Sequence, residues 1–307
     1  MDVFLTLLSS IAPLYGLIAL GWVAGRFYGV ERESLAGLAI YVIVPFVSFY
    51  YVATLEFKPA YAALPLIAFI LYTSVTLLFL KIGHRVYPDK RANLLAMCAG
   101  ASNTGYFGLP LVILLLPPVW TGVYIFMLLG GLFYEATILY YIANRSHFSP
   151  KESMLRVLRF PTLYAVFLGL IVNFAGLSLP SALDPYWAYF KGAYIVIGMM
   201  LVGGSLSKAP KLVIVPRFIA LVFAGQFILW PLLAFMIVLF DRSVTQAFEP
   251  EIHKMLMLMA IVPPAANVTA YAAKLNLNPE KAATTVLLGT IFALVYIPAF
   301  LVLSGLF

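Results

Sequence analysis

Long apolar runs separated by short polar stretches are the dominant pattern of this chain. An α-helix needs roughly 20 apolar residues to cross the hydrocarbon of a bilayer. When each run is ended at charges and prolines, the pattern predicts ten membrane-spanning helices, at residues 3–25, 34–55, 61–83, 91–116, 119–143, 161–178, 187–207, 214–240, 251–274 and 279–305. We therefore predict an all-α polytopic membrane protein with little chain left for a soluble domain.

The composition fits a lipid environment. Of the 307 residues, 64% are hydrophobic and 10% are charged, whereas a soluble globular chain has roughly 25% charged residues. The formal net charge of +7 does not indicate nucleic-acid binding, because the Lys and Arg residues lie in short loops between the apolar runs. The single cysteine, Cys98, cannot form an internal disulfide, and no two histidines have metal-ligand spacing. We expect no metal site and no cofactor.

The distribution of basic residues predicts the topology. Cytoplasmic loops of membrane proteins carry an excess of Lys and Arg. When alternate loops are assigned to opposite sides, one side receives most of the 19 basic residues. The other side receives only Lys58, Lys191, Arg242 and Lys254. We therefore predict a multi-pass protein of the cell membrane (plasma or inner membrane) with both termini extracytoplasmic.

The connection 144–160 divides the chain into two parts. It contains Ser149, Pro150 and Glu152, a capping box that predicts the start of a short helix with apolar and basic faces. Such a helix would lie on the cytoplasmic leaflet. We predict a first five-helix repeat at 1–143, an amphipathic cytoplasmic linker at 144–160 and a second five-helix repeat at 161–307.

Two predicted spans are interrupted near their middle. The fourth contains Asn103 within the segment GASNTGYFGLP, and the ninth contains Asn267 within PPAANVTAY. Each is the fourth span of its half. Because each half has five spans, the second half must enter the membrane from the opposite side, so the duplication is predicted to be inverted.

A break inside a span frees backbone N–H and C=O groups that hydrocarbon cannot satisfy. Such a break persists where protein or a watery cavity lines it, and in inverted-repeat transporters these half-helix ends form the substrate site. The amides of Asn103 and Asn267 could bridge the breaks or bind a carboxylate. The alternative is a proline kink with Asn as an interhelical hydrogen-bonding residue. The matched positions of the two breaks favour the substrate site.

The residues at these breaks resemble a known family. The segment Asn103–Leu111 (NTGYFGLPL) is similar to the N-T-x-x-x-G-[IL]-P-L signature of the auxin efflux carrier family, which includes plant PIN proteins and prokaryotic relatives. The stretch from Pro263 through Pro279 is similar to the ninth and tenth helices of that family. The resemblance covers essentially the whole chain. Because only 144–160 separates the halves, the chain resembles the prokaryotic type.

The resemblance implies a fold like that of sodium/proton antiporters and bile-acid symporters, with a scaffold and a mobile crossover domain in which the broken helices cross. It also implies that the crossing point of helices 4 and 9 binds the carboxylate of a small organic anion. The substrate-binding residues are then expected among those at the two breaks: Asn103, Thr104, Pro110, Pro263, Pro264, Asn267 and Tyr271.

Glu135 is the only acidic residue deep within a predicted span. A charge at the bilayer centre costs about 2.5–3.5 kcal/mol on insertion scales, so a functional role is the first hypothesis. Glu135 would carry a proton or bind a coupling cation, H⁺ or Na⁺. The alternative is a neutral Glu that is hydrogen-bonded between helices.

These observations predict a secondary transporter, a permease or efflux carrier of small organic anions such as carboxylates, that works by alternating access. The alternative is a sodium-coupled symporter of larger organic anions such as bile acids. An intramembrane enzyme would need a nucleophile with a base or paired acids within the spans, and Glu135 is the only candidate, so we expect no enzyme. The expected partners are the organic anion and the lipid bilayer, without nucleic acid; a homodimer stays open.

Overall fold

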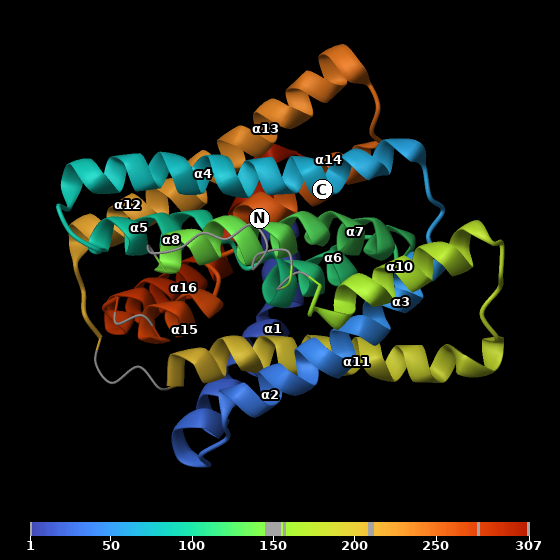
Figure 1. The fold of residues 1–307 in the computed structure, drawn as a ribbon, viewed down its shortest axis with the longest axis horizontal. Coiled ribbons are helices and arrows are strands. Elements are labelled where there is room, and N and C mark those ends of the chain that lie inside the picture. Colours follow the sequence, from blue (N-terminus) through green and yellow to red (C-terminus); the bar gives the residue numbers. More distant parts are fainter. Residues whose placement is uncertain (1, 145–154, 156–157, 208–211, 275–276, 306–307) are drawn as a thin grey trace.

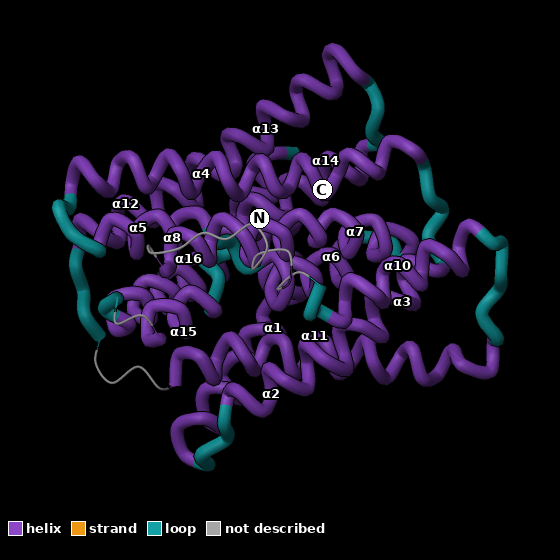
Figure 2. The backbone as a smooth tube through the Cα atoms, viewed as in Figure 1, coloured by secondary structure: helices purple, strands orange, loops and turns teal. Residues whose placement is uncertain are grey.

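The computed structural model describes residues 2–144, 155, 158–207, 212–274 and 277–305. Figure 2 shows helices and loops throughout these ranges, and the described residues contain one isolated β-bridge. Most of the predicted linker 144–160, including its capping box, lies outside the described residues.

The helices of the first part of the chain follow the predicted spans. They are α1 (Asp2–Phe27), α2 (Arg32–Leu38), α3 (Val44–Ala53), α4 (Leu64–Val86), α5 (Arg91–Gly100), α6 (Leu109–Leu115), α7 (Val119–Tyr134) and α8 (Tyr140–Asn144). π-Helical turns at Ala39–Ile43 and Glu135–Leu139 join α2 to α3 and α7 to α8, and another at Thr104–Gly108 precedes α6.

The second part contains α10 (Pro161–Phe174), α11 (Asp184–Ser207), α12 (Pro216–Ala224), α13 (Trp230–Phe240), α14 (Pro250–Ile261), α15 (Asn267–Lys274) and α16 (Pro279–Ser304). A π-helical turn at Gly225–Leu229 joins α12 to α13. Four of these helices begin with proline, whose fixed φ and missing N–H suit the first helical turn. The observed boundaries differ from the predicted ones by a few residues. For example, α10 ends at Phe174, whereas the prediction ended this span at residue 178.

Seven helices of the described residues are long and apolar enough to cross a membrane: Val3–Phe27, Arg32–Ala53, Pro59–Val86, Val119–Ala143, Ser181–Ser207, Pro216–Thr245 and Pro279–Ser304. Two further apolar helices, Thr104–Leu115 and Pro161–Phe174, are shorter. This pattern fits a polytopic membrane protein. The total of ten spans and their division into inverted halves stay predictions.

The helices pack in two groups. In the first helix group (α1, α2, α3, α10 and α11), α1 packs along α11 and α3 packs along α10. In the second helix group (α4–α8 and α12–α16), α4 packs on α5 and α7, α13 packs on α14, and α15 packs on α16. In Figure 1, α2 and α11 lie along the lower edge, and α4, α13 and α14 lie along the upper edge. The two groups meet where α1 contacts α16, α3 contacts α7, and α11 contacts the turn Thr104–Gly108.

Candidate functional site

The two helix breaks lie directly against each other. An antiparallel bridge joins Ser102, between α5 and α6, to Pro264, between α14 and α15. The main-chain N–H of Asn103 donates to the Pro263 carbonyl at 2.9 Å, and the main-chain N–H of Ala265 donates to the Ala101 carbonyl at 2.8 Å. Each break thus satisfies main-chain groups that the other break frees.

Tyrosine hydroxyls satisfy further carbonyls of the fourth-span break. Tyr72 on α4 donates to the Ser102 carbonyl at 3.2 Å, and Tyr124 on α7 donates to the Thr104 carbonyl at 3.1 Å. From the first helix group, Tyr194 on α11 donates to the Gly105 carbonyl at 2.8 Å. The sequence did not single out these tyrosines, because their hydrogen bonds depend on distances between helices that a hydropathy pattern does not contain.

Two residues of the α12–α13 span also donate hydrogen bonds at and beside the breaks. Gln226 Nε2 donates to the Val262 carbonyl at 2.9 Å and to Ser102 Oγ at 2.7 Å, and Trp230 Nε1 donates to the Ala99 carbonyl at 3.1 Å. Both side chains are fully buried. Gln226 could have been found in the sequence, because it is a polar residue in the middle of an apolar run.

A cavity of about 450 Å³ lies between the two helix groups. Its volume falls in the range of about 300–1,000 Å³ that is typical of small-molecule sites. Its wall is mainly apolar, with a few polar side chains from both groups, among them Arg32, Asn103, Thr104, Glu135, Tyr194 and Asn267. The cavity therefore combines the size and the sparse polar groups of a site for a small ligand.

The structure brings five of the eight proposed functional residues to this cavity. Asn103, Thr104, Asn267, Tyr271 and Glu135 all line it.

The three prolines are not among the lining residues. Pro110 is buried in the first turn of α6, and Pro263 supplies the carbonyl that accepts from Asn103. A Cβ atom added to Gly289 on α16 would lie 2.7 Å from Pro264 Cδ, so this ring packs against α16. The prolines shape the breaks rather than face the cavity.

The side chains of the two asparagines leave hydrogen-bonding atoms without a partner. Asn103 is 6% exposed, and among the described residues its Nδ2 has no acceptor. Asn267 Nδ2 donates to Glu135 Oε1 at 2.8 Å, whereas Asn267 Oδ1 has no donor in the described part of the chain. A buried amide N–H without an acceptor costs about 1–3 kcal/mol. Both asparagines are lining residues of the cavity.

Comparison with known proteins decides the class. Residues 6–301 match the family described as "Membrane transport protein". The chain belongs to this family, that of the auxin efflux carriers. The family resemblance inferred at Asn103–Leu111 is confirmed.

A relative supports the same assignment. An uncharacterized transporter of Methanocaldococcus jannaschii is 27% identical over 237 residues, which cover 71% of this chain and 75% of the relative. This member of the membrane transport protein family is a multi-pass transport protein rather than an enzyme.

The wall of the cavity in this membrane transport protein carries charged side chains of both signs. Among the described residues that line it, Arg32 is the one cation and Glu135 is the one carboxylate. Arg32 Nε donates to Ser205 Oγ on α11 at 2.6 Å. Sequence reasoning counted Arg32 as a loop residue; in the structure it forms the first turn of α2. The sequence did not predict that Arg32 lines a cavity, because Arg32 lies among other charged residues of a predicted loop.

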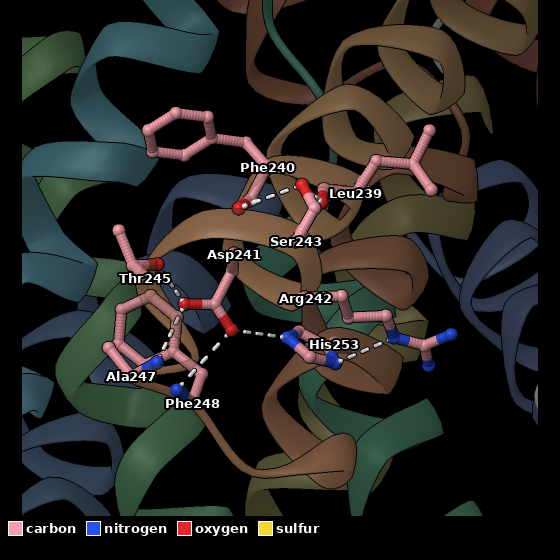
Figure 3. A network of polar contacts seen from close by, with 9 residues as sticks. All are labelled: Leu239, Phe240, Asp241, Arg242, Ser243, Thr245, Ala247, Phe248 and His253. Atoms are coloured by element: carbon pink, nitrogen blue, oxygen red, sulfur yellow. Dashed lines mark hydrogen bonds and ion pairs between the residues drawn. The ribbon is translucent and has the colours of Figure 1, made fainter.

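A buried carboxylate lies away from the cavity, at the corner between α13 and α14 (Figure 3). Asp241 is 3% exposed and accepts hydrogen bonds from Thr245 Oγ1 at 2.5 Å and from the amide N of Ala247 at 2.9 Å. Its Oδ2 pairs with His253 Nε2 at 2.8 Å, and Arg242 Nε donates to His253 Nδ1 at 3.3 Å. The Arg242 bond needs a lone pair on Nδ1, so the hydrogen of the ring lies on Nε2, facing Asp241.

These contacts connect the start of α14, the first half of the broken ninth span, to the end of the eighth span.

Within the described residues, no group of three or more His, Cys, Asp or Glu side chains is placed to hold a metal ion.

Proposed function

We propose that this protein is a secondary transporter of small organic anions such as carboxylates, with its binding site where the breaks of the fourth and ninth spans meet. The observation that carries the proposal is Asn103, which lines a cavity of about 450 Å³ and whose buried Nδ2 has no acceptor among the described residues. A carboxylate oxygen is a strong acceptor for such a donor. The N-terminus of α15 at Asn267 adds positive helix-dipole character to the same wall.

The cavity lies between the two helix groups, which suits alternating access. In this mechanism the second helix group moves against the first and exposes the site to each side in turn. The main-chain bonds between the breaks keep both halves of the site together in such a movement. The ten spans and the inverted halves, 1–143 and 161–307, belong to this proposal.

The orientation follows from the loop charges. The cavity wall includes Arg32, Phe160 and Ser205, near the ends of α2, α10 and α11 that adjoin the loops rich in Lys and Arg. With those loops in the cytoplasm and both termini outside, the cavity faces the cytoplasm. The membrane is then the plasma or inner membrane of the cell.

Glu135 is the proposed site of cation coupling. An ionised Glu135 repels an anion in the same cavity, and protonation removes this repulsion. Asn267 holds its carboxylate. Among the described lining residues Glu135 is the one carboxylate, so it is the group whose ionisation adds a negative charge to the cavity. We assign the proton rather than Na⁺ as the coupling ion.

Ligand-induced thermal stabilisation tests the binding site. Purified protein is heated with a panel of carboxylates, beside Asn103→Ala and the control Asn173→Ala, which alters an Asn of α10 that does not line the cavity. We expect at least one carboxylate to raise the melting temperature of the wild type and the control but not of Asn103→Ala. If no carboxylate stabilises the wild type, or if Asn103→Ala responds equally, the proposed site is wrong.

The alternative function is a sodium-coupled symporter of larger organic anions. Uptake into proteoliposomes with and without a sodium gradient separates the two. Uptake that requires sodium at every pH would favour the alternative.

A further inference from the structure

Arg32 has a position that its sequence context did not predict. It lines the cavity, and its Nε donates to Ser205 Oγ, which in turn donates to the Leu201 carbonyl at 2.7 Å. The guanidinium group carries five N–H donors in a planar fork, and the bond to Ser205 uses one of them. The neighbouring Glu33 interacts electrostatically with Arg32, but its side chain is exposed and is not among the lining residues.

Arg32 shares the cavity wall with Tyr106. This tyrosine lies in the π-helical turn that follows Asn103, and it lines the cavity together with Arg32 and Glu135. Its ring lies 6.2 Å from the ring of Tyr194, centroid to centroid. Arg32 therefore acts on the same space as the amides at the break, from the wall that the first helix group supplies.

We propose that Arg32 binds an anionic group of the transported molecule, so that the substrate is held between this guanidinium and the asparagine amides at the break. This inference rests on the proposed function and deepens it. A guanidinium binds a carboxylate through two parallel hydrogen bonds. Asn103 Nδ2 donates to an acceptor oxygen at the other end. The preferred substrate class is a small organic acid with oxygen acceptors at both ends.

The charges of the lining residues favour the binding of an anion when Glu135 is protonated. With Glu135 ionised, the charged lining residues cancel, because Arg32 is the one cation beside the one carboxylate among the described lining residues. With Glu135 protonated, Arg32 leaves a net positive charge in a mainly apolar wall, where an anion gains most from electrostatic attraction. Anion binding is then favoured together with a proton.

Two probes of equal chain length test the inference. Succinate and butyrate both have four carbons, but only succinate has a carboxylate at each end. Dissociation constants are measured by calorimetry for the wild type, Arg32→Gln, Arg32→Lys and Arg26→Gln. The last is a matched control, because Arg26 is an exposed arginine at the end of α1 that does not line the cavity.

We expect the wild type to bind succinate more tightly than butyrate. Arg32→Gln should weaken succinate binding by more than tenfold, because loss of one partner from a desolvated charge pair has effects of this size. Butyrate binding should change less. Arg32→Lys should recover part of the loss, since it keeps the charge without the fork, and Arg26→Gln should match the wild type.

Ser205→Ala distinguishes binding from a structural role. It removes the hydrogen bond to Arg32 and keeps the positive charge, so the preference for succinate over butyrate should persist. The inference is overturned if Arg32→Gln keeps this preference, or if Arg32→Gln and Ser205→Ala change it alike. If Asn103→Ala still loses carboxylate binding in that case, the proposed function stands. If the wild type binds no carboxylate, the proposed function itself fails.

Discussion

Glu135 Oε1 accepts the side-chain N–H of Asn267 at 2.8 Å, at the point where α7 changes into a π-helical turn. The ionisable Glu135 thus lines the cavity and also contacts the ninth-span break through Asn267. This contact also explains why Asn267 differs from Asn103: its Nδ2 already has an acceptor, whereas that of Asn103 has none among the described residues.

Replacing Glu135 by Gln tests the coupling role. Gln keeps the shape and can still accept from Asn267, but it cannot ionise. We expect wild-type uptake in proteoliposomes to rise as the pH falls, because protonation removes a negative charge from the cavity. Uptake by Glu135→Gln should be nearly independent of pH. Asp89→Asn, in an exposed loop away from the cavity, is the control. A Glu135→Gln variant with the full wild-type pH profile would exclude this residue as the proton carrier.

The residues that could be found from sequence share one property, because they are polar within long apolar runs. Asn103, Asn267 and Glu135 stand out in this way, and the structure places all of them at the cavity. Arg32 could not be found, since an arginine beside other loop charges has no sequence feature that separates it from a topology signal. The side-chain donors of Tyr72 and Tyr124 depend on distances between helices, which hydropathy does not contain.

At the scale of elements, π-helical turns interrupt several spans beside the cavity or beside the breaks. The turn Ala39–Ile43 contributes Ile40 to the cavity, Thr104–Gly108 follows the fourth-span break, and Glu135–Leu139 begins with Glu135. The turn Gly225–Leu229 contains Gln226, which donates to the ninth-span break. π-Helical turns occur frequently at functional sites, and here they change the direction of a helix face without ending the span.

The α13–α14 corner should determine the stability of the ninth span. Asp241→Ala would leave the buried His253 Nε2 and the partly buried main-chain N–H groups of Ala247 and Phe248 without their acceptor. We expect a loss of about 3 kcal/mol in the free energy of unfolding, measured as a lower melting temperature in detergent. Asp184→Ala, at the exposed start of α11, should have little effect. Equal melting temperatures for the two variants would contradict a structural role for the corner.

At the scale of the whole molecule, the two helix groups meet closely at Gly198 on α11. A Cβ atom added there would lie 3.6 Å from the Cβ of Tyr106 in the second helix group. Disulfide bonds join Cβ atoms about 3.5–4.5 Å apart. A disulfide between these positions would therefore link the two groups with little distortion.

The double variant Gly198→Cys/Tyr106→Cys tests the relative movement of the groups. We expect oxidation to stop uptake and reduction to restore it, because a cross-link blocks the exchange between the two orientations. Each single cysteine variant is a control, and the native Cys98 is buried. Undiminished uptake by fully cross-linked protein would show that transport does not need this movement.

The division into two helix groups was beyond what the sequence could define. Apolar runs predict where helices occur, and the helices of the described residues lie within or close to the predicted ranges. Which helices pack together depends on side-chain contacts between distant segments, such as α1 with α11 and α3 with α10. The resemblance of Asn103–Leu111 to a family motif supplied the expectation of a scaffold and a mobile domain, but not its members.

The bridge between Ser102 and Pro264 has a consequence for how such a protein can diversify. The main-chain hydrogen bonds beside it, from Asn103 to Pro263 and from Ala265 to Ala101, do not depend on which side chains are present. Substitutions of the lining side chains can therefore alter the shape and polarity of the cavity while the main-chain hydrogen bonds that hold the two breaks together are kept.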